Sequence, residues 1–280
     1  MKRRGSITAG AVAIAVGVVL WGDSNFARKT HGLIQNAEAQ IMPGTSFSLP
    51  YPAPPSPEEW APMPAADRLA DVRRRVKPRL DAELKSRGLN RGQPAFIRIF
   101  KETRELELWL QPKPGEAYQL FRTYPIAVFS GYLGPKTREG DMQAPEGFYA
   151  FGKSLLNPAS RYHLAFNIGY PNEYDRHHQC TGSLIMVHGR RVSIGCFAMT
   201  DPVIEEIYLI VEAALSKGQP KVPVHIFPFR MTSERLDQAR VANDANLDFW
   251  LGLRAGYDAF ETKKLPPTMS VQEGKYHFQP

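Results

Sequence analysis

Eight of the 22 residues from position 43 to position 64 are proline. Proline lacks an amide hydrogen and holds φ near one value, so this density excludes helix interiors and sheet ladders and favours an extended polyproline II chain. The segment is therefore predicted to be a linker rather than part of a core. The chain is therefore predicted to have three parts: residues 1–28, a proline-rich linker at 29–64, and a folded body from residue 65 onward.

Residues 1–28 have the pattern of an export signal. Lys2, Arg3 and Arg4 precede an uncharged apolar run at residues 7–20, which is typical of a secretory signal peptide. The run is shorter than the ~20 apolar residues that a membrane-spanning helix needs. No clear pair of small residues marks a cleavage site, so a signal peptide is favoured and an uncleaved N-terminal anchor stays open. Either way the protein is expected to leave the cytoplasm.

The overall composition is that of a globular protein. Hydrophobic residues make up 43% of the chain and charged residues 22%, which argues against global disorder. The net charge of +7 suits anionic partners without choosing among them. The secretory start and the absence of clustered basic and aromatic motifs speak against nucleic acid. Two cysteines exclude a multi-bridge disulfide scaffold and a four-cysteine zinc module.

Apolar residues at helical spacing from Leu69 to Leu84 predict a helical lead-in over residues 65–94, which Pro78 should kink or divide into two helices. From residue 95 alternating and apolar runs predict strands, the first three as antiparallel neighbours. The expected strands are residues 96–100, 106–110, 118–129, 147–151, 162–168, 184–187 and 222–227.

Two further helices are expected in the second half of the chain. Asp201 and Pro202 have the N-cap and first-turn proline pattern of a helix that continues through residues 203–216. Residues 247–260 form the second helix, and the tail from Pro266 shows no periodicity. The predicted fold is a mainly β body with appended α-helices, α+β overall.

The stretch from residue 184 to residue 201 carries the chemistry. An apolar strand ends at His188, a polar turn follows, and Gly195-Cys196 leads toward the Asp201 helix. A nearby histidine and the positive end of a helix dipole both favour the reactive thiolate. Gly195 allows a tight turn, so that its N–H and that of Cys196 would face the oxygen of a tetrahedral intermediate. From these residues alone, a buried cysteine beside a packing histidine remains the alternative.

His188-Gly189, followed by Ser193-x-Gly195-Cys196, resembles the signature of the L,D-transpeptidase catalytic domain with the YkuD-type fold. The longer string over residues 182–201 is similar to the YafK-like branch of that family. Other stretches that resemble this branch are residues 96–101, 131–136, 143–149, 163–167, 174–176 and 228–231.

The resemblance covers residues 95–231 and leaves residues 232–280 as a helical C-terminal extension and tail. It implies a β-rich catalytic sandwich and a periplasmic, murein-directed enzyme without a cofactor. It also implies Cys196 as the nucleophile and His188 as the general base and acid.

This chain departs from the wider family at one position of the motif. Most members have Ser/Thr-His-Gly-Cys, whereas this chain has Ile194 where the second histidine stands. His188 is therefore left to be oriented by the Gly189 carbonyl or the Ser193 hydroxyl, because an imidazole needs a second hydrogen bond to hold its tautomer.

The implied reaction is acyl transfer at the L-centre of meso-diaminopimelate in a peptidoglycan stem peptide, through a thioester on Cys196. An acceptor amine would give a cross-link or an anchored lipoprotein, and water would give hydrolysis. Release of a murein-linked outer-membrane lipoprotein by an amidase therefore stands beside transpeptidation. From another class, a non-catalytic wall-binding protein is the alternative.

Four further residues are substrate-binding candidates. Arg230, and Arg176 beside Tyr174, would each bind a stem-peptide carboxylate bidentately, with a structural ion pair as the alternative. His163 lies in a predicted strand, where it would face the cleft or pack in the core.

No metal site and no disulfide are expected. His177 and His178 are adjacent and would point to opposite sides of an extended chain, so they do not form a zinc set with Cys180. A bridge between Cys180 and Cys196 is disfavoured, because a strand from residue 183 to residue 188 would hold the two apart.

Overall fold

The computed structural model describes residues 64–279. The predicted leader and nearly all of the predicted linker lie outside this range. Within it, no helix is both long enough and apolar enough to span a membrane.

Five strands form the first sheet, in the order β3-β2-β1-β10-β5. Their bounds are β1 (Ala95–Phe100), β2 (Glu105–Leu110), β3 (Gln119–Pro125), β5 (Gly147–Phe151) and β10 (Val222–Phe227). The first three are antiparallel neighbours, as the sequence predicts. β10 then joins β1 as a parallel strand, although more than 120 residues separate them in the chain.

The second sheet has the order β4-β9-β8-β7-β6. Its strands are short: β4 (Val128–Phe129), β6 (Leu156–Asn157), β7 (Ala165–Asn167), β8 (Met186–His188) and β9 (Phe197–Ala198). The predicted single strand over residues 118–129 is wrong. It divides into β3 of the first sheet and β4 of the second, because after Pro125 the Ala127 N–H donates to the carbonyl of Ala198 in β9.

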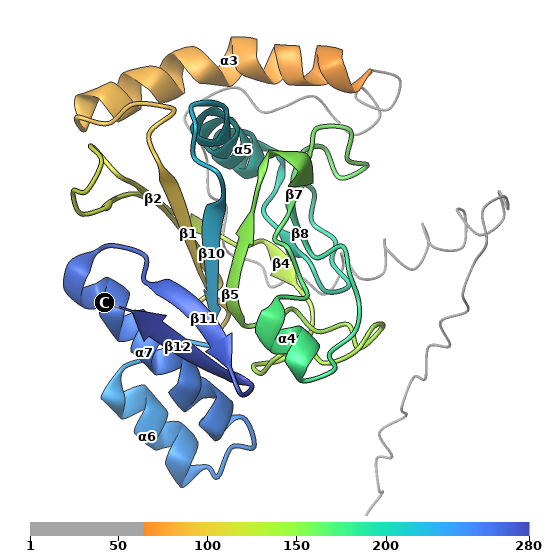
Figure 1. The fold of residues 1–280 in the computed structure, drawn as a ribbon. Helices are drawn as coiled ribbons and strands as arrows, with labels where there is room; N and C mark the ends of the chain where they lie inside the picture. The colour runs from red at the N-terminus through yellow and green to blue at the C-terminus, as the bar shows by residue number, and fades with distance from the viewer. Residues whose placement is uncertain (1–63, 280) are drawn as a thin grey trace, which may run out of the picture. The chain divides into compact units, whose positions relative to one another are not determined.

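The main core lies between the two sheets and under two helices (Figure 1). Phe151 of the first sheet stacks on Phe166 of the second, with ring centroids 4.4 Å apart. Helix α5 (Asp201–Ser216) is buried along most of its length, and α3 (Ala65–Ser86) packs across it. This core holds the second sheet, which carries the candidate site, against the larger first sheet.

Helix α3 runs unbroken through Pro78, so the predicted second helix at this residue is wrong. Pro78 is solvent-exposed, while Val72, Val76, Leu80 and Leu84 are buried on either side of it. A proline inside a helix costs ~3 kcal/mol. Burial of one such aliphatic side chain returns ~1.5–3 kcal/mol, so the buried stripe outweighs the proline.

The C-terminal part covers the outer face of the first sheet (Figure 1). It consists of α6 (Ser233–Val241), α7 (Leu247–Lys263), β11 (Thr268–Gln272) and β12 (Lys275–Gln279). The last two form a hairpin, so the prediction of an aperiodic tail missed two strands. A Cβ at Gly256 of α7 would stand 2.5 Å from Phe278 and 2.6 Å from Phe148, which shows how closely these parts pack.

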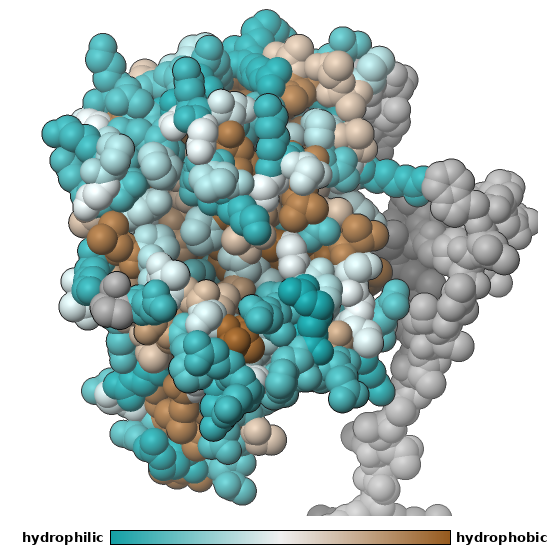
Figure 2. Space-filling view, in the orientation of Figure 1, coloured by the Kyte–Doolittle hydropathy of each residue, from teal (hydrophilic) through white to brown (hydrophobic). Residues whose placement is uncertain are grey.

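Two mixed sheets and the five helices of the described region, which include the short α4 (Glu173–His177), confirm the predicted α+β class. Figure 2 shows hydrophilic side chains over most of the visible surface, with apolar side chains in small separate groups.

Candidate active site

Strands β8 and β9 bring the predicted nucleophile and base together. They are parallel neighbours, with Val187 paired to Phe197 and His188 to Ala198. Cys196 therefore comes beside Met186, whose N–H donates to the Cys196 Sγ at 3.3 Å. The register thus places Cys196 just before β9 and beside Met186, which is two residues from His188 on β8, although Cys196 and His188 are eight residues apart in sequence.

The His188 ring has a defined tautomer. Its Nδ1 lies 2.5 Å from the carbonyl oxygen of Gly189. A carbonyl oxygen can only accept a hydrogen bond, so the proton is on Nδ1 and Nε2 carries the lone pair. His188 is only 2% exposed, and the Tyr162 ring covers it at a centroid distance of 4.7 Å.

Gly189 stands where no side chain fits. A Cβ there would lie 2.5 Å from Asp201 Oδ1 and 2.8 Å from the Tyr162 carbonyl oxygen.

The predicted N-cap role of Asp201 is wrong: Thr200 is the N-cap and Asp201 is the first helical residue. The Asp201 carboxylate instead accepts the Arg190 N–H at 2.7 Å, which ties the turn after His188 to the start of α5.

Burial favours the neutral form of both reactive groups. It lowers the pKa of His188, and the hydrogen bond to Gly189 opposes this only in part. It raises the pKa of the Cys196 thiol, against the Met186 N–H and the positive charge of Lys136. At neutral pH the pair therefore rests as thiol and imidazole rather than as thiolate and imidazolium.

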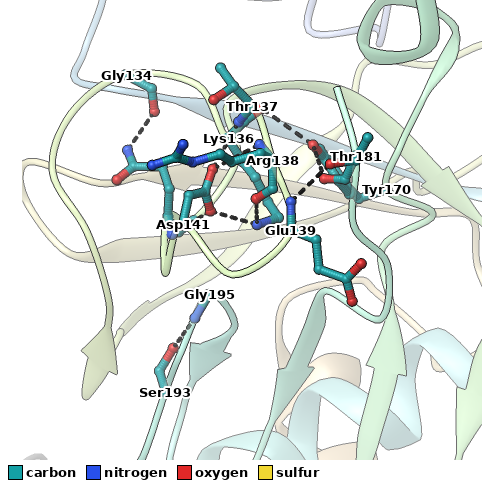
Figure 3. Close-up of polar contacts among 12 residues, drawn as sticks. Gly134, Lys136, Thr137, Arg138, Glu139, Asp141, Tyr170, Thr181, Ser193 and Gly195 are labelled. Carbon is teal, nitrogen blue, oxygen red and sulfur yellow. Dashed lines mark hydrogen bonds and ion pairs between the residues drawn. The ribbon is translucent and has the colours of Figure 1, made fainter. Parts of the chain in front are cut away.

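Ser193 holds the turn before Cys196 rather than the histidine. Its hydroxyl donates to the Cys196 carbonyl at 2.6 Å. The same hydroxyl accepts the Gly195 N–H at 3.2 Å (Figure 3). Gly195 has φ +139°, which favours glycine. Of the two partners proposed for the His188 ring, the structure places the Gly189 carbonyl there. The Gly195 N–H, expected to face an oxyanion, is engaged by Ser193 in this state.

The structure places the predicted substrate-binding residues in other contacts. Arg230 pairs with Glu105 and Glu107 of β2, at 2.8 and 2.9 Å. His163 is fully buried, with its Nε2 2.8 Å from Glu205 of α5.

The remaining two candidates lie at α4. Arg176 donates to the Pro171 carbonyl at 2.6 Å. Tyr174 stacks on Tyr276 of the C-terminal hairpin, with centroids 4.5 Å apart. None of the contacts of these four residues joins them to Cys196 or His188 in the part of the chain that the structure describes.

Sequence reasoning missed several groups at the site. The thiol lies 3.7 Å from the Leu184 carbonyl, and Tyr162 covers the base. Lys136, whose charge acts on the thiol, comes from a loop sixty residues earlier. The one indication in the sequence that Lys136 belongs to the site was the resemblance of residues 131–136 to the family. Both cysteines are free thiols in the structure.

The chain belongs to the L,D-transpeptidase family. Residues 95–226 match the YkuD L,D-transpeptidase catalytic domain, which covers both sheets and both motif residues.

One relative is "Putative L,D-transpeptidase YafK" of Escherichia coli K12, which is 50% identical over 185 residues, 66% of this chain and 74% of that protein. Two solved structures are also similar. The helical cell shape determining protein Pgp2 of Campylobacter jejuni has 18% identity and a TM-score of 0.38, over 69% of this chain and 80% of that one. Bd1075 of Bdellovibrio bacteriovorus has 25% identity and a TM-score of 0.34, over 60% and 62%.

Proposed function

We propose that this protein is a periplasmic, cysteine-dependent acyl-transfer enzyme of peptidoglycan. Cys196 is its nucleophile and His188 its general base and acid. The observation that carries the proposal is the tautomer of His188. Because Nδ1–H is held by the Gly189 carbonyl, the lone pair of Nε2 is free to accept the proton of the Cys196 thiol, and Cys196 directly precedes the neighbouring strand β9.

The reaction proceeds in two steps. Nε2 of His188 takes the thiol proton as Cys196 Sγ attacks an amide carbonyl at the L-centre of meso-diaminopimelate in a stem peptide. The tetrahedral intermediate collapses, the C–N bond breaks, and His188 gives its proton to the leaving amine. A thioester on Cys196 remains, and an amine or water, deprotonated by His188, then displaces the thiolate.

Backbone N–H groups support the charges that form. Met186 N–H already contacts the sulfur at 3.3 Å. The Gly195 N–H makes a long bond of 3.2 Å to Ser193. It would exchange this bond for the developing oxyanion, which is a stronger acceptor.

The periplasmic location is supported by the sequence of residues 1–20, where basic residues precede the apolar run. The substrate class is supported by membership of the L,D-transpeptidase family. The positive net charge is compatible with anionic wall polymers.

An amidase that releases a murein-linked lipoprotein is the second candidate, and an apolar rim around the thiol favours it. The rim consists of Leu184 and Ile194, which are 64% and 77% exposed. The Leu184 carbonyl contacts the sulfur, and Ile194 lies two residues before Cys196. Exposed apolar groups that cluster at a site are typical of protein interaction surfaces. They would fit a polypeptide leaving group better than a stem-peptide amine.

The test uses the full-length protein and sacculi that carry covalently bound lipoprotein, with mass spectrometry of the products. New 3→3 linked dimers would identify a transpeptidase, whereas released lipoprotein together with labelled water oxygen in the diaminopimelate carboxyl left on the stem peptide would identify an amidase. Cys196→Ala should abolish either product, whereas the matched variant Cys180→Ala should stay active. Binding of the wild-type protein to sacculi without any product would contradict the enzyme and favour a wall-binding protein.

A further inference from the structure

The aromatic ring of Tyr162 lies over the imidazole of His188. The two ring centroids are 4.7 Å apart, and the ring planes are tilted by 36°. Tyr162 is 43% exposed and His188 only 2%, so the tyrosine ring separates the imidazole from solvent on this side. The Tyr162 carbonyl oxygen also packs against Gly189, 2.8 Å from the position that a Cβ there would occupy. Tyr162 therefore contacts both His188 and the residue whose carbonyl orients it.

The backbone is strained at the residue after Tyr162. His163 has φ +71°, a left-handed conformation that residues with a Cβ rarely adopt. The other non-glycine residues with positive φ between positions 64 and 279 are exposed or partly exposed, whereas His163 is fully buried. Strain of this kind persists only where the surroundings enforce it, and it is concentrated at functional sites.

Two helices enforce the conformation of His163. Its Nε2 lies 2.8 Å from Oε1 of Glu205 in α5, and both side chains are fully buried. Arg75 of α3 donates to the same carboxylate from two nitrogens, at 2.8 and 3.3 Å, and also to Asp71 at 2.6 Å. The carboxylate that anchors His163 is therefore itself fixed. Because α3 precedes the residues that match the catalytic domain, a helix outside that domain helps to place His163.

The anchored segment runs directly beside the imidazole. Strand β7 is the antiparallel neighbour of β8, and the Gly189 N–H donates to the Leu164 carbonyl at 3.1 Å. The His163 Cβ stands 3.0 Å from the Cβ position at Gly189. Because His163 is fixed, the residue before it has little freedom, and the Tyr162 ring is kept against His188.

The charged groups on the elements around His188 are paired with other residues. Asp201 of α5 forms an ion pair with Arg190 at 3.7 Å, and Glu205 is held by the guanidinium of α3. The thiol of Cys196 is neutral, because burial raises its pKa. Burial is also the main influence on the pKa of His188, which it lowers, and the tyrosine ring supplies part of that burial.

We propose that Tyr162 is a positioning residue whose ring holds the His188 imidazole in its Nδ1–H orientation and keeps water away from it. The strained backbone at His163, anchored by Glu205 and Arg75, holds the ring in place. The role belongs to the aromatic ring and not to the phenol hydroxyl. The inference rests on the proposed function, in which His188 is the base.

The test observes the imidazole without substrate. Full-length protein is labelled with ¹⁵N at histidine, and NMR reports the tautomer and the pKa of His188, whose signals are those missing from His188→Gln. In the wild-type protein the neutral ring should carry its proton on Nδ1. Tyr162→Ala should let the ring turn, so that an Nε2–H population appears. It should also admit water and raise the pKa of His188 by about 0.5 to 1, toward its ordinary value.

Three further variants separate the ring from its surroundings. Tyr162→Phe keeps the ring and should restore the wild-type tautomer and pKa. Leu120→Ala on β3 removes a side chain of similar exposure, 41%, and should change neither. His163→Asn tolerates positive φ but is too short to reach Glu205 as histidine does, so it should give the Tyr162→Ala change in weaker form. With sacculi, Tyr162→Ala should lower kcat by about tenfold with little effect on KM.

Three results would overturn the proposal or its parts. If Tyr162→Ala left the tautomer and pKa of His188 unchanged, the ring would merely fill space. If Tyr162→Phe lost turnover while its histidine signals matched the wild type, the hydroxyl would be acting on substrate. Unchanged His188 signals in His163→Asn would overturn the anchoring. These signals need no catalysis, so each result stays distinct from a failure of the proposed function, which Cys196→Ala reports.

Discussion

His188 donates its Nδ1 hydrogen to the carbonyl oxygen of Gly189, the very next residue, at 2.5 Å. A neutral carbonyl orients the ring but stabilises an imidazolium less than a carboxylate would, so burial dominates and the pKa of His188 falls. The proposed catalytic pair is consequently neutral at rest, and in the proposed mechanism a proton moves from Cys196 to His188 as the sulfur attacks.

Replacement of the base should remove most of the activity. His188→Gln keeps a polar side chain but has no group that takes the thiol proton, so turnover should fall by ~10²–10⁴-fold. The rate of product formation from sacculi measures the loss. His277→Gln, at an exposed position on β12, is the matched control and should keep full activity. Near-normal turnover in His188→Gln would rule out the assigned role.

The pH profile of kcat/KM should be a broad bell. The base must be unprotonated, and its pKa is lowered below 6.5, so activity should fall only at a pH below that value. The thiol must supply the proton for the leaving amine, and its pKa is raised above 9.0, so the alkaline fall should lie above that value. A resting thiolate–imidazolium pair would instead place the alkaline limb at the pKa of a stabilised imidazolium, near neutral pH.

Gly189→Ala should damage both stability and activity. The new Cβ would meet Asp201 Oδ1 at 2.5 Å and the Tyr162 carbonyl at 2.8 Å, which are groups that cannot easily move. We expect a loss of ~1–3 kcal/mol in unfolding free energy and a displaced His188 ring. Gly252→Ala in α7 is the control, since a Cβ there meets nothing within 4 Å. It should stabilise the protein by ~0.5–1 kcal/mol in the same urea titration.

The fully buried pair of Lys101 and Glu146, whose Nζ and Oε1 lie 2.9 Å apart, should show strong coupling. Lys101→Met leaves the Glu146 carboxylate buried with only the Gly134 and Trp250 N–H donors, and should cost ~3–5 kcal/mol in unfolding free energy. A double variant that adds Glu146→Gln removes the unpaired charge, so it should be more stable than Lys101→Met alone. Additive losses in urea titrations would mean that the two groups do not act as a pair.

Local sequence patterns predicted many of the helices and strands. The apolar runs predicted β1, β2, β5 and β10 of the first sheet near their observed bounds, and the helical spacing predicted α3, α5 and α7. The errors lie where distant packing outweighed a local signal. Pro78 was expected to kink the helix or divide it into two, but α3 runs through it as one helix, and buried side chains on both sides of Pro78 hold it together.

The C-terminal hairpin was missed for a related reason. The run from Thr268 to Gln279 has no strong periodicity of its own. Its strands form because Tyr276 stacks on Tyr174 and Phe278 packs on Phe148 of β5, which are partners that the local sequence does not contain.

By itself the sequence predicted the candidate reactive groups, because a strand-end histidine and a Gly-Cys turn are encoded within a dozen residues. Only the tertiary structure decided their electrostatics. The lowered pKa of His188 and the raised pKa of the Cys196 thiol depend on burial by parts of the chain that are distant in sequence. Desolvation and Coulomb interactions depend on distances in space, which the order of residues along a chain does not state.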